Sequence, residues 1–219
     1  MSTSTVAAVV FDLDGVLTDT ETIWDEVRRG LAAEDGVPWP EGTTEAMMGM
    51  STPEWAHHLA SRVGIGGDPA ERAISGMVER TREHLPTLPG AVEAVRRLAA
   101  TWPLAVASSS PRRLIDNSLR TLGIADLFEA SVSTEEVERG KPAPDGYLRA
   151  CELLGVDPAR AVAIEDSSNG LRSASAAGLT VIAVPHEAFP PAADALELAD
   201  VTVSGLDEVT VELVAGLLP

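Results

Sequence analysis

Two aspartates that follow a short apolar run are the first residues able to carry out chemistry. Residues 6–11 are apolar, Asp12 and Asp14 come next, and Gly15 follows them. A run of this length predicts a buried strand, and glycine allows a sharp exit that exposes both carboxylates. Two such carboxylates can share a metal ion and divide the work between a nucleophile and a general acid/base. Taken alone, the pair could equally be an acidic turn that caps a helix.

A serine segment follows a second apolar run, which ends at residue 107. Ser108, Ser109 and Ser110 stand there before Pro111. A hydroxyl beside the free N–H groups at the start of a helix forms an anion site. The Ser-Pro pair also predicts that Ser110 caps a helix beginning at the proline, and capping alone could explain the segment.

Lys141 is the only lysine in the chain. It lies between Gly140 and Pro142 in a composition that otherwise uses arginine for positive charge. An ammonium group can bind phosphate as a point charge and can stabilise a crowded group of carboxylates. A chance position on an exposed loop is the alternative.

A second acidic pair, Glu165 and Asp166, follows the apolar run that ends at residue 164. Carboxylates are the oxygen ligands that Mg²⁺ prefers, together with water and substrate phosphate. Capping of the next helix by Asp166, Ser167 or Ser168 would explain the same residues.

The elements that must position these groups are strands that alternate with helices. Apolar runs end at residues 11, 107, 164, 184 and 203, with a weaker one at 132, and helical patterns lie between most of them. This alternation predicts an α/β fold with a doubly wound, Rossmann-like parallel sheet. Ligands bind at the carboxyl ends of the strands in such a sheet, so the polar groups above should meet there.

One stretch interrupts the alternation. Residues 20–87 show no strand pattern but three helical patterns, over 23–33, 53–63 and 70–85. We therefore expect two domains: an α/β core of residues 1–18 and 87–219, and a helical cap of residues 19–86 inserted after the first strand.

Composition narrows the partners. The 219 residues carry a net charge of −18, which disfavours nucleic acid and anionic membranes as partners. No apolar run reaches the roughly 18 residues needed to span a membrane, and we expect a cytoplasmic protein. Cys151 is the only cysteine, so no intrachain disulfide is possible, and we expect a buried thiol. The composition is compatible with a monomer.

Taken together, the four segments resemble the haloacid dehalogenase superfamily of aspartyl phosphotransferases. The resemblance is to the branch with a helical cap after the first motif, which includes β-phosphoglucomutase and small sugar phosphatases. It implies that Asp12 is the nucleophile, that Asp14 is the acid/base, and that Ser108 and Lys141 hold the phosphoryl group.

The resemblance also implies a metal and a substrate region. Mg²⁺ would be held by Asp12, the backbone carbonyl of Asp14 and Asp166, with Glu165 acting directly or through water. The substrate would be a small phosphorylated metabolite, and the residues expected near it are Ser109, Thr20, Trp24, Gly49 and Thr52.

The expected function is Mg²⁺-dependent hydrolysis of a small phosphate monoester, a sugar or polyol phosphate, through an aspartyl-phosphate. Asp14 argues against carbon–halogen hydrolysis, because the dehalogenases of the superfamily lack this second aspartate. A phosphomutase is the alternative, but Trp24 and Thr52 stand where β-phosphoglucomutases carry a histidine and an arginine. A catalytically silent binding protein on the same fold is a further alternative.

Overall fold

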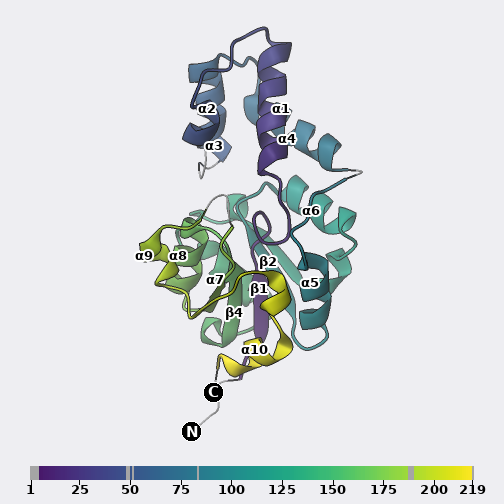
Figure 1. Ribbon diagram of the computed structural model, residues 1–219, viewed down its shortest axis with the longest axis vertical. Coiled ribbons are helices and arrows are strands. Elements are labelled where there is room, and N and C mark those ends of the chain that lie inside the picture. The colour runs from purple at the N-terminus through teal and green to yellow at the C-terminus, as the bar shows by residue number, and fades with distance from the viewer. Residues whose placement is uncertain (1–4, 48–49, 51, 83, 187–189, 219) are drawn as a thin grey trace.

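A computed structural model describes residues 5–47, 50, 52–82, 84–186 and 190–218. Its centre is a sheet of six parallel strands in the order β3-β2-β1-β4-β5-β6 (Figure 1). The strands are β1 Ala8–Phe11, β2 Leu104–Ser108, β3 Ala130–Ser133, β4 Ala161–Glu165, β5 Thr180–Ala183 and β6 Val201–Thr202. The strand order reverses between β1 and β4, which is where such sheets bind ligands. The predicted parallel sheet is confirmed, including the weaker strand that ends near residue 132.

Helices cover both faces of the sheet. On one face, α5 Ala91–Ala99, α6 Arg112–Thr121 and α10 Val211–Gly216 pack against alternate residues of β1 such as Val9 and Phe11. On the other face, α7 Asp145–Leu154, α8 Ser168–Ala176 and α9 Ala193–Leu196 pack on the side of Val10. The side chains of the strands are apolar on both faces because both are buried. Cys151 of α7 is buried in the second cluster, as expected.

A helical insert stands above the sheet, between β1 and α5 (Figure 1). It consists of α1 Glu21–Glu34, α2 Thr43–Met47, α3 Thr52–His58, a π-helical turn Leu59–Val63 and α4 Pro69–Thr81. The three predicted helical segments are present after the first strand, and α2 is additional. The last of them ends at Thr81 rather than at residue 85. Pro86 disfavours helical backbone in Leu85, which the predicted segment included.

The helical insert has a hydrophobic cluster of its own. Trp24, Leu31, Trp55 and Met77 are among its buried members, and Leu114 of α6 is also part of it. None of the described helices is long and apolar enough to cross a membrane.

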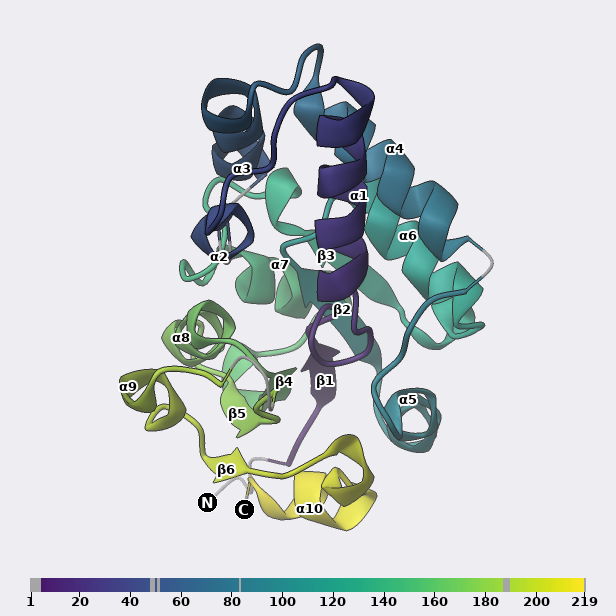
Figure 2. The same cartoon turned by 45° about the horizontal axis from the view of Figure 1, so that its top comes forward.

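Two connections between the insert and the rest of the chain are prominent among the residues that the structure describes. The first is the chain crossing, where Thr18 bridges Thr87 and the Asp19 N–H donates to the Pro86 carbonyl at 3.0 Å. The second is the contact of α4 with α6, which run side by side in Figure 2. There the side-chain amide of Asn117 donates to the Thr81 hydroxyl at 2.9 Å.

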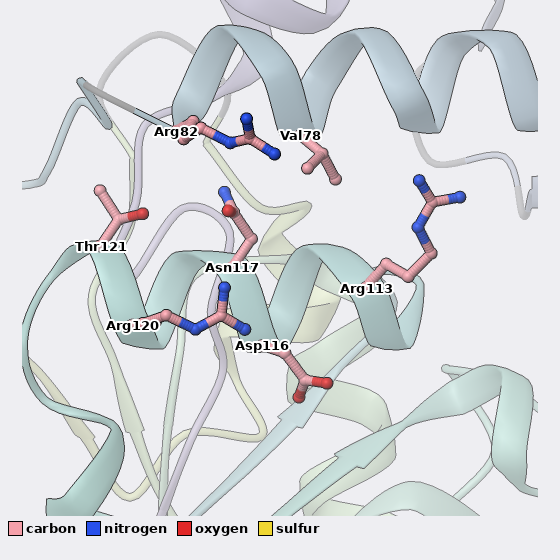
Figure 3. Close-up of a pocket in the computed structure, with 7 residues that line it drawn as sticks. All are labelled: Val78, Arg82, Arg113, Asp116, Asn117, Arg120 and Thr121. Carbon is pink, nitrogen blue, oxygen red and sulfur yellow. The ribbon is translucent and has the colours of Figure 1, made fainter.

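A hollow of about 420 Å³ opens along this helix pair (Figure 3). Three arginines border it: Arg82 from the end of α4, and Arg113 and Arg120 from α6. Arg113 also pairs with Glu71 of α4 at 2.6 Å, so the contact between the insert and the sheet-covering helices is both apolar and ionic. The hollow lies outside the carboxyl edge of the sheet that carries the predicted catalytic groups.

Candidate active site

Asp12 stands at the carboxyl end of β1, where the Asp12 N–H still donates to the Ile164 carbonyl at 3.0 Å. This bond extends the pairing of β1 with β4 and fixes the backbone under the carboxylate. The side chain is buried, and its Oδ1 lies 2.7 Å from the Lys141 Nζ. Burial raises the pKa of Asp12 to about 7, although Lys141 acts in the opposite direction. The carboxyl group is therefore poised to change charge near neutral pH.

Lys141 links the two acidic segments. Its Nζ lies 2.7 Å from the Asp12 Oδ1 and 2.5 Å from the Glu165 Oε1, and its side chain is only 5% exposed. Burial opposes the charged ammonium, but the two carboxylates outweigh burial and raise the pKa of Lys141. The only lysine of the chain thus brings a permanent positive charge to the carboxyl edge of the sheet.

Glu165 is fully buried and surrounded by donors. Its Oε1 accepts from Lys141 at 2.5 Å and from the Tyr147 hydroxyl at 3.1 Å. Its Oε2 accepts from the Asp166 N–H at 2.9 Å, and from the N–H and hydroxyl of Ser167 at 3.0 and 3.1 Å. Gly170 makes room for this group, because a Cβ there would lie 1.6 Å from the Glu165 Oε1. The carboxylate is held rigidly, with donors on both oxygens.

Asp166 differs from its neighbour because one of its oxygens lacks a donor. It is 9% exposed, and its Oδ1 has no hydrogen-bond partner among the described residues. Burial, together with Glu165 and Asp12, raises the pKa of Asp166 to about 9. Oxygens of Asp12, Glu165 and Asp166 all lie within 4.8 Å of one another. Three crowded acids facing one lysine form a site that a divalent cation would stabilise.

Asp14 makes a different set of contacts. Its carboxylate accepts from the hydroxyls of Ser110 at 2.6 Å, Thr20 at 2.8 Å and Thr18 at 3.1 Å. The turn that joins Asp14 to Thr18 is tight, because the Gly15 N–H donates to the Thr18 carbonyl at 2.7 Å. Asp14 is not part of the carboxylate cluster, so a metal contact through its backbone carbonyl stays a prediction.

The prediction that Ser110 caps the next helix is wrong. The residue at the N-cap of α6 is Pro111, whose extended backbone moves the helix start to Arg112. The hydroxyl of Ser110 is therefore free to donate to Asp14.

The other two serines of this segment differ in exposure. Ser108 is buried at the end of β2, and its Oγ accepts from the Ser110 N–H at 3.0 Å. Ser109 is exposed. The adjacent strands β1 and β2 thus place Ser108 near Asp12 at the same edge.

The residues expected near the substrate are spread over the insert. Thr20 directly precedes α1 and donates to Asp14, so it lies beside the predicted acid/base. Trp24 packs against Trp55 with 5.6 Å between ring centroids, and Thr52 begins α3. Gly49 lies outside the described residues. Substrate contacts of these residues stay predictions.

The sequence did not reveal that Tyr147 contacts Glu165 or that Ser110 contacts Asp14. Tyr147 lies on the apolar stripe of a helix, where periodicity marks it as a core residue. A Ser-Pro pair before a helix is a capping pattern, which masks the second use of Ser110.

Comparison with known proteins agrees with this geometry. Residues 6–178 match the haloacid dehalogenase-like hydrolase family. The chain is 32% identical over 210 residues to the validoxylamine A 7'-phosphate phosphatase of Streptomyces hygroscopicus, covering 91% of this chain and 94% of that protein. It is 32% identical over 219 residues to hexitol phosphatase B of Escherichia coli, covering 96% and 97%.

A solved structure shares the fold over nearly the whole length. CbbY from Rhodobacter sphaeroides in complex with phosphate has a TM-score of 0.82 at 27% identity, covering 93% of this chain and 96% of that one. The matches confirm the resemblance carried by the four sequence segments. The chain belongs to the haloacid dehalogenase-like hydrolase family.

Proposed function

We propose that this protein is a Mg²⁺-dependent phosphatase that hydrolyses a small sugar or polyol phosphate through an aspartyl-phosphate on Asp12. The observation that carries the proposal is the contact of the Asp12 carboxylate with Lys141 at 2.7 Å. It lies at the same edge of the sheet as Asp166, whose Oδ1 has no partner among the described residues. The substrate class is supported by the relatives, one of which is a hexitol phosphatase.

The residues fit a magnesium ion. The unpaired Oδ1 of Asp166 lies in a buried carboxylate group that lacks enough positive charge, and all the donors are oxygens, as Mg²⁺ requires. Asp12, Asp166 and the backbone carbonyl of Asp14 would hold the ion, while Glu165 is occupied by its own donors. When bound, the ion would offset the negative charge of the phosphate and of Asp12.

The residues of the chain then divide the reaction between them. A carboxylate oxygen of Asp12 attacks phosphorus, and the bond from phosphorus to the leaving oxygen breaks. Asp14 gives its proton to that leaving oxygen. It then takes a proton from the water that attacks the aspartyl-phosphate, which releases inorganic phosphate and regenerates Asp12. Lys141 and the hydroxyl of Ser108 hold the phosphoryl oxygens during both steps.

The helical insert, residues 19–86, acts in this proposal as a cap over the carboxyl edge of the sheet. Thr20 contacts Asp14 and is immediately followed by α1, so the first helix of the insert rises directly from the catalytic acid/base. A cap in this position would exclude bulk water during the first transfer step.

The test is release of free phosphate from a panel of sugar, polyol, nucleotide and glycolate phosphates, with Mg²⁺ or with EDTA. The Asp12→Asn variant removes the nucleophile, and Asp116→Asn, an exposed carboxylate on α6, serves as the matched control. We expect release by the wild type and Asp116→Asn only with Mg²⁺, and none above background by Asp12→Asn.

Two other outcomes would change the assignment. Isomerised sugar phosphate that depends on a bisphosphate primer, without free phosphate, would replace the phosphatase by a phosphomutase. Binding of Mg²⁺ and phosphate without any product from the whole panel would contradict an enzymatic role on these substrates.

A further inference from the structure

The hollow between α4 and α6 gathers positive charge that the proposed reaction does not use. Its volume is about 420 Å³, and Arg82, Arg113 and Arg120 line it (Figure 3). The whole chain carries 34 acidic side chains against 16 basic ones. A chain of this charge repels anions except where its basic groups are concentrated. Three guanidinium groups around one hollow are such a concentration.

The three arginines belong to two different parts of the chain. Arg82 is the C-cap residue of α4 in the insert, whereas Arg113 and Arg120 lie on α6, beside the sheet. Positions 113, 117 and 120 are spaced by four and three residues, so they share one face of α6. In the view of Figure 3, the side chain of Asn117 stands between the guanidinium groups of Arg82 and Arg120. The basic groups therefore face the hollow from both of its sides.

The present partners of these arginines hold them only loosely. Arg113 pairs with Glu71 at 2.6 Å, but both side chains are more than half exposed. Arg82 lies 3.7 Å from Glu79, also at the surface. Arg120 makes no ion pair among the described residues. Exposed ion pairs contribute little to stability, so an anion with more charge than a carboxylate can replace them.

The other polar groups of the hollow are compatible with an anion. Asp116 also lines it, but its carboxylate pairs with Arg112 at 3.4 Å and points away from α4 in Figure 3. Asn117 is buried at the floor, where its amide donates to the Thr81 hydroxyl at 2.9 Å. The lining is thus polar between the two helices, and the positive groups point into it.

We propose that the hollow is a second anion site, which binds a small phosphorylated compound and ties the insert to α6. Guanidinium groups bind phosphate through paired N–H donors, and a phosphate monoester carries close to two negative charges at neutral pH. A volume of about 420 Å³ exceeds the need of a single oxyanion and lies in the range of small-molecule sites. The organic part of the ester would lie against Val78, the apolar residue of the lining.

This site is separate from the carboxyl edge of the sheet. None of the described residues that line the hollow is a candidate catalytic or metal-binding residue. Its positive charge comes from side chains, so binding there should not require Mg²⁺. At the carboxyl edge, the carboxylates of Asp12, Glu165 and Asp166 repel an anion unless a cation is present. Binding in EDTA therefore distinguishes the two sites.

A ligand in the hollow would contact the insert and α6 at once. The bond between Asn117 and Thr81 already connects the two helices. An anion held by Arg82 and Arg120 would add a second connection across the same joint. Its binding would favour the arrangement in which α4 packs on α6, because that arrangement brings the arginines together.

The experiment measures binding without turnover. Inorganic phosphate and glucose 6-phosphate are titrated by calorimetry in EDTA into the wild type and into Arg82→Met, Arg113→Met and Arg120→Met. Arg80→Met is the matched control, because Arg80 is an exposed arginine of α4 that pairs with Glu26 and does not line the hollow. The three arginines that line the hollow are exposed as well, so all four variants should fold.

We expect one molecule of glucose 6-phosphate to bind per chain. Its Kd should rise about 10- to 100-fold in Arg82→Met and Arg120→Met, and should keep the wild-type value in Arg80→Met. Arg120→Lys keeps the charge without the planar fork, so it should weaken binding less than Arg120→Met. At 100 times Kd, the ester should raise the Tm of the wild type by about 5–10 °C in EDTA. Equally tight binding of inorganic phosphate, lost in the same variants, would identify free phosphate as the occupant.

Two results would overturn the proposal. If the Kd is the same in the wild type and in all three hollow variants, the anion binds elsewhere on the chain. If the folded wild type binds neither anion in EDTA, the hollow is not an anion site. Phosphate release with Mg²⁺ is measured separately, so neither result decides the proposed phosphatase function.

Discussion

Replacement of Tyr147 by phenylalanine removes a single hydrogen bond from the proposed catalytic centre. The Tyr147 hydroxyl donates to the Glu165 Oε1 at 3.1 Å, and both side chains are fully buried. Burial and the Glu165 carboxylate raise the pKa of Tyr147, so it remains a donor at any working pH. A hydrogen bond to a charged group contributes about 1.5–3 kcal/mol. Lys141 still satisfies the same oxygen in the variant, and no polar group is left in the cavity. We therefore expect a net loss of about 1–2 kcal/mol.

This loss should appear in two measurements. The Tm should fall by about 3–6 °C, as expected for a chain of this length. If Glu165 positions Lys141 for phosphoryl transfer, kcat should fall about 5- to 30-fold, the rate equivalent of the same free energy. KM should change little, because Tyr147 does not contact the substrate region.

Cys151→Ala is the matched control for this experiment. Cys151 lies one turn further along α7, is buried in the same cluster and makes no contact with Glu165 among the described interactions. It should lower Tm by a similar amount and leave kcat at the wild-type value. A Tyr147→Phe variant with wild-type Tm and kcat would refute the positioning argument. A loss of kcat in both variants would show that general loosening of α7 is the cause.

Four further outcomes follow from the geometry. Gly15 has φ +87°, and a Cβ there would lie 2.0 Å from the Asp166 Oδ2. The Gly15→Ala variant should therefore fold but lose the rise in Tm that Mg²⁺ causes in the wild type. An undiminished rise in Tm would show that Asp166 is not the metal ligand. The pKa values of Asp12 and Asp166 are raised to about 7 and about 9. Above pH 4, the folded protein without metal therefore binds more protons than the unfolded chain. The free energy of unfolding of the metal-free protein should fall as pH rises towards 9. For the same reason the Mg²⁺-induced rise in Tm, measured by scanning fluorimetry, should grow between pH 6 and pH 9, and a flat profile would contradict it. Leu114 is 5% exposed inside the hydrophobic cluster of the insert. The Leu114→Ala variant should therefore lower the free energy of unfolding, measured by urea titration, by about 2–4 kcal/mol. A change below about 0.5 kcal/mol would mean that the stability of the insert does not depend on packing against α6.

Most of the sheet, and the meeting of the candidate site residues at its carboxyl edge, could be predicted because both depend on strands. The apolar runs that end at residues 11, 107 and 164 are each followed by a polar residue. Parallel strands bring those ends to one edge, so Asp12, Ser108 and Asp166 could be expected to meet there. The helical insert was expected as a set of helices, but α2 has only five residues, Thr43–Met47, too few for a period to show.

The contacts of Ser110 and Tyr147 could not be predicted from the sequence for the same reason. Ser110 and Tyr147 each satisfy a local rule, a cap before proline and a core position on a helix, and their polar atoms act across the chain instead. Arg28 stands beside Arg29 in α1, and such a pair usually indicates a solvated face. Its burial depends on Trp55, which comes from another helix and cannot be read from the local sequence.

Reagents that couple to amines would meet an unusual target in this protein. The only side-chain amine is that of Lys141, which is 5% exposed and bonded to two carboxylates. Its pKa is raised, so it remains an ammonium ion and a poor nucleophile under the mildly alkaline conditions of ester coupling. Such reagents should therefore leave the carboxyl edge of the sheet unmodified in the folded protein, and modification of Lys141 should report unfolding of this edge.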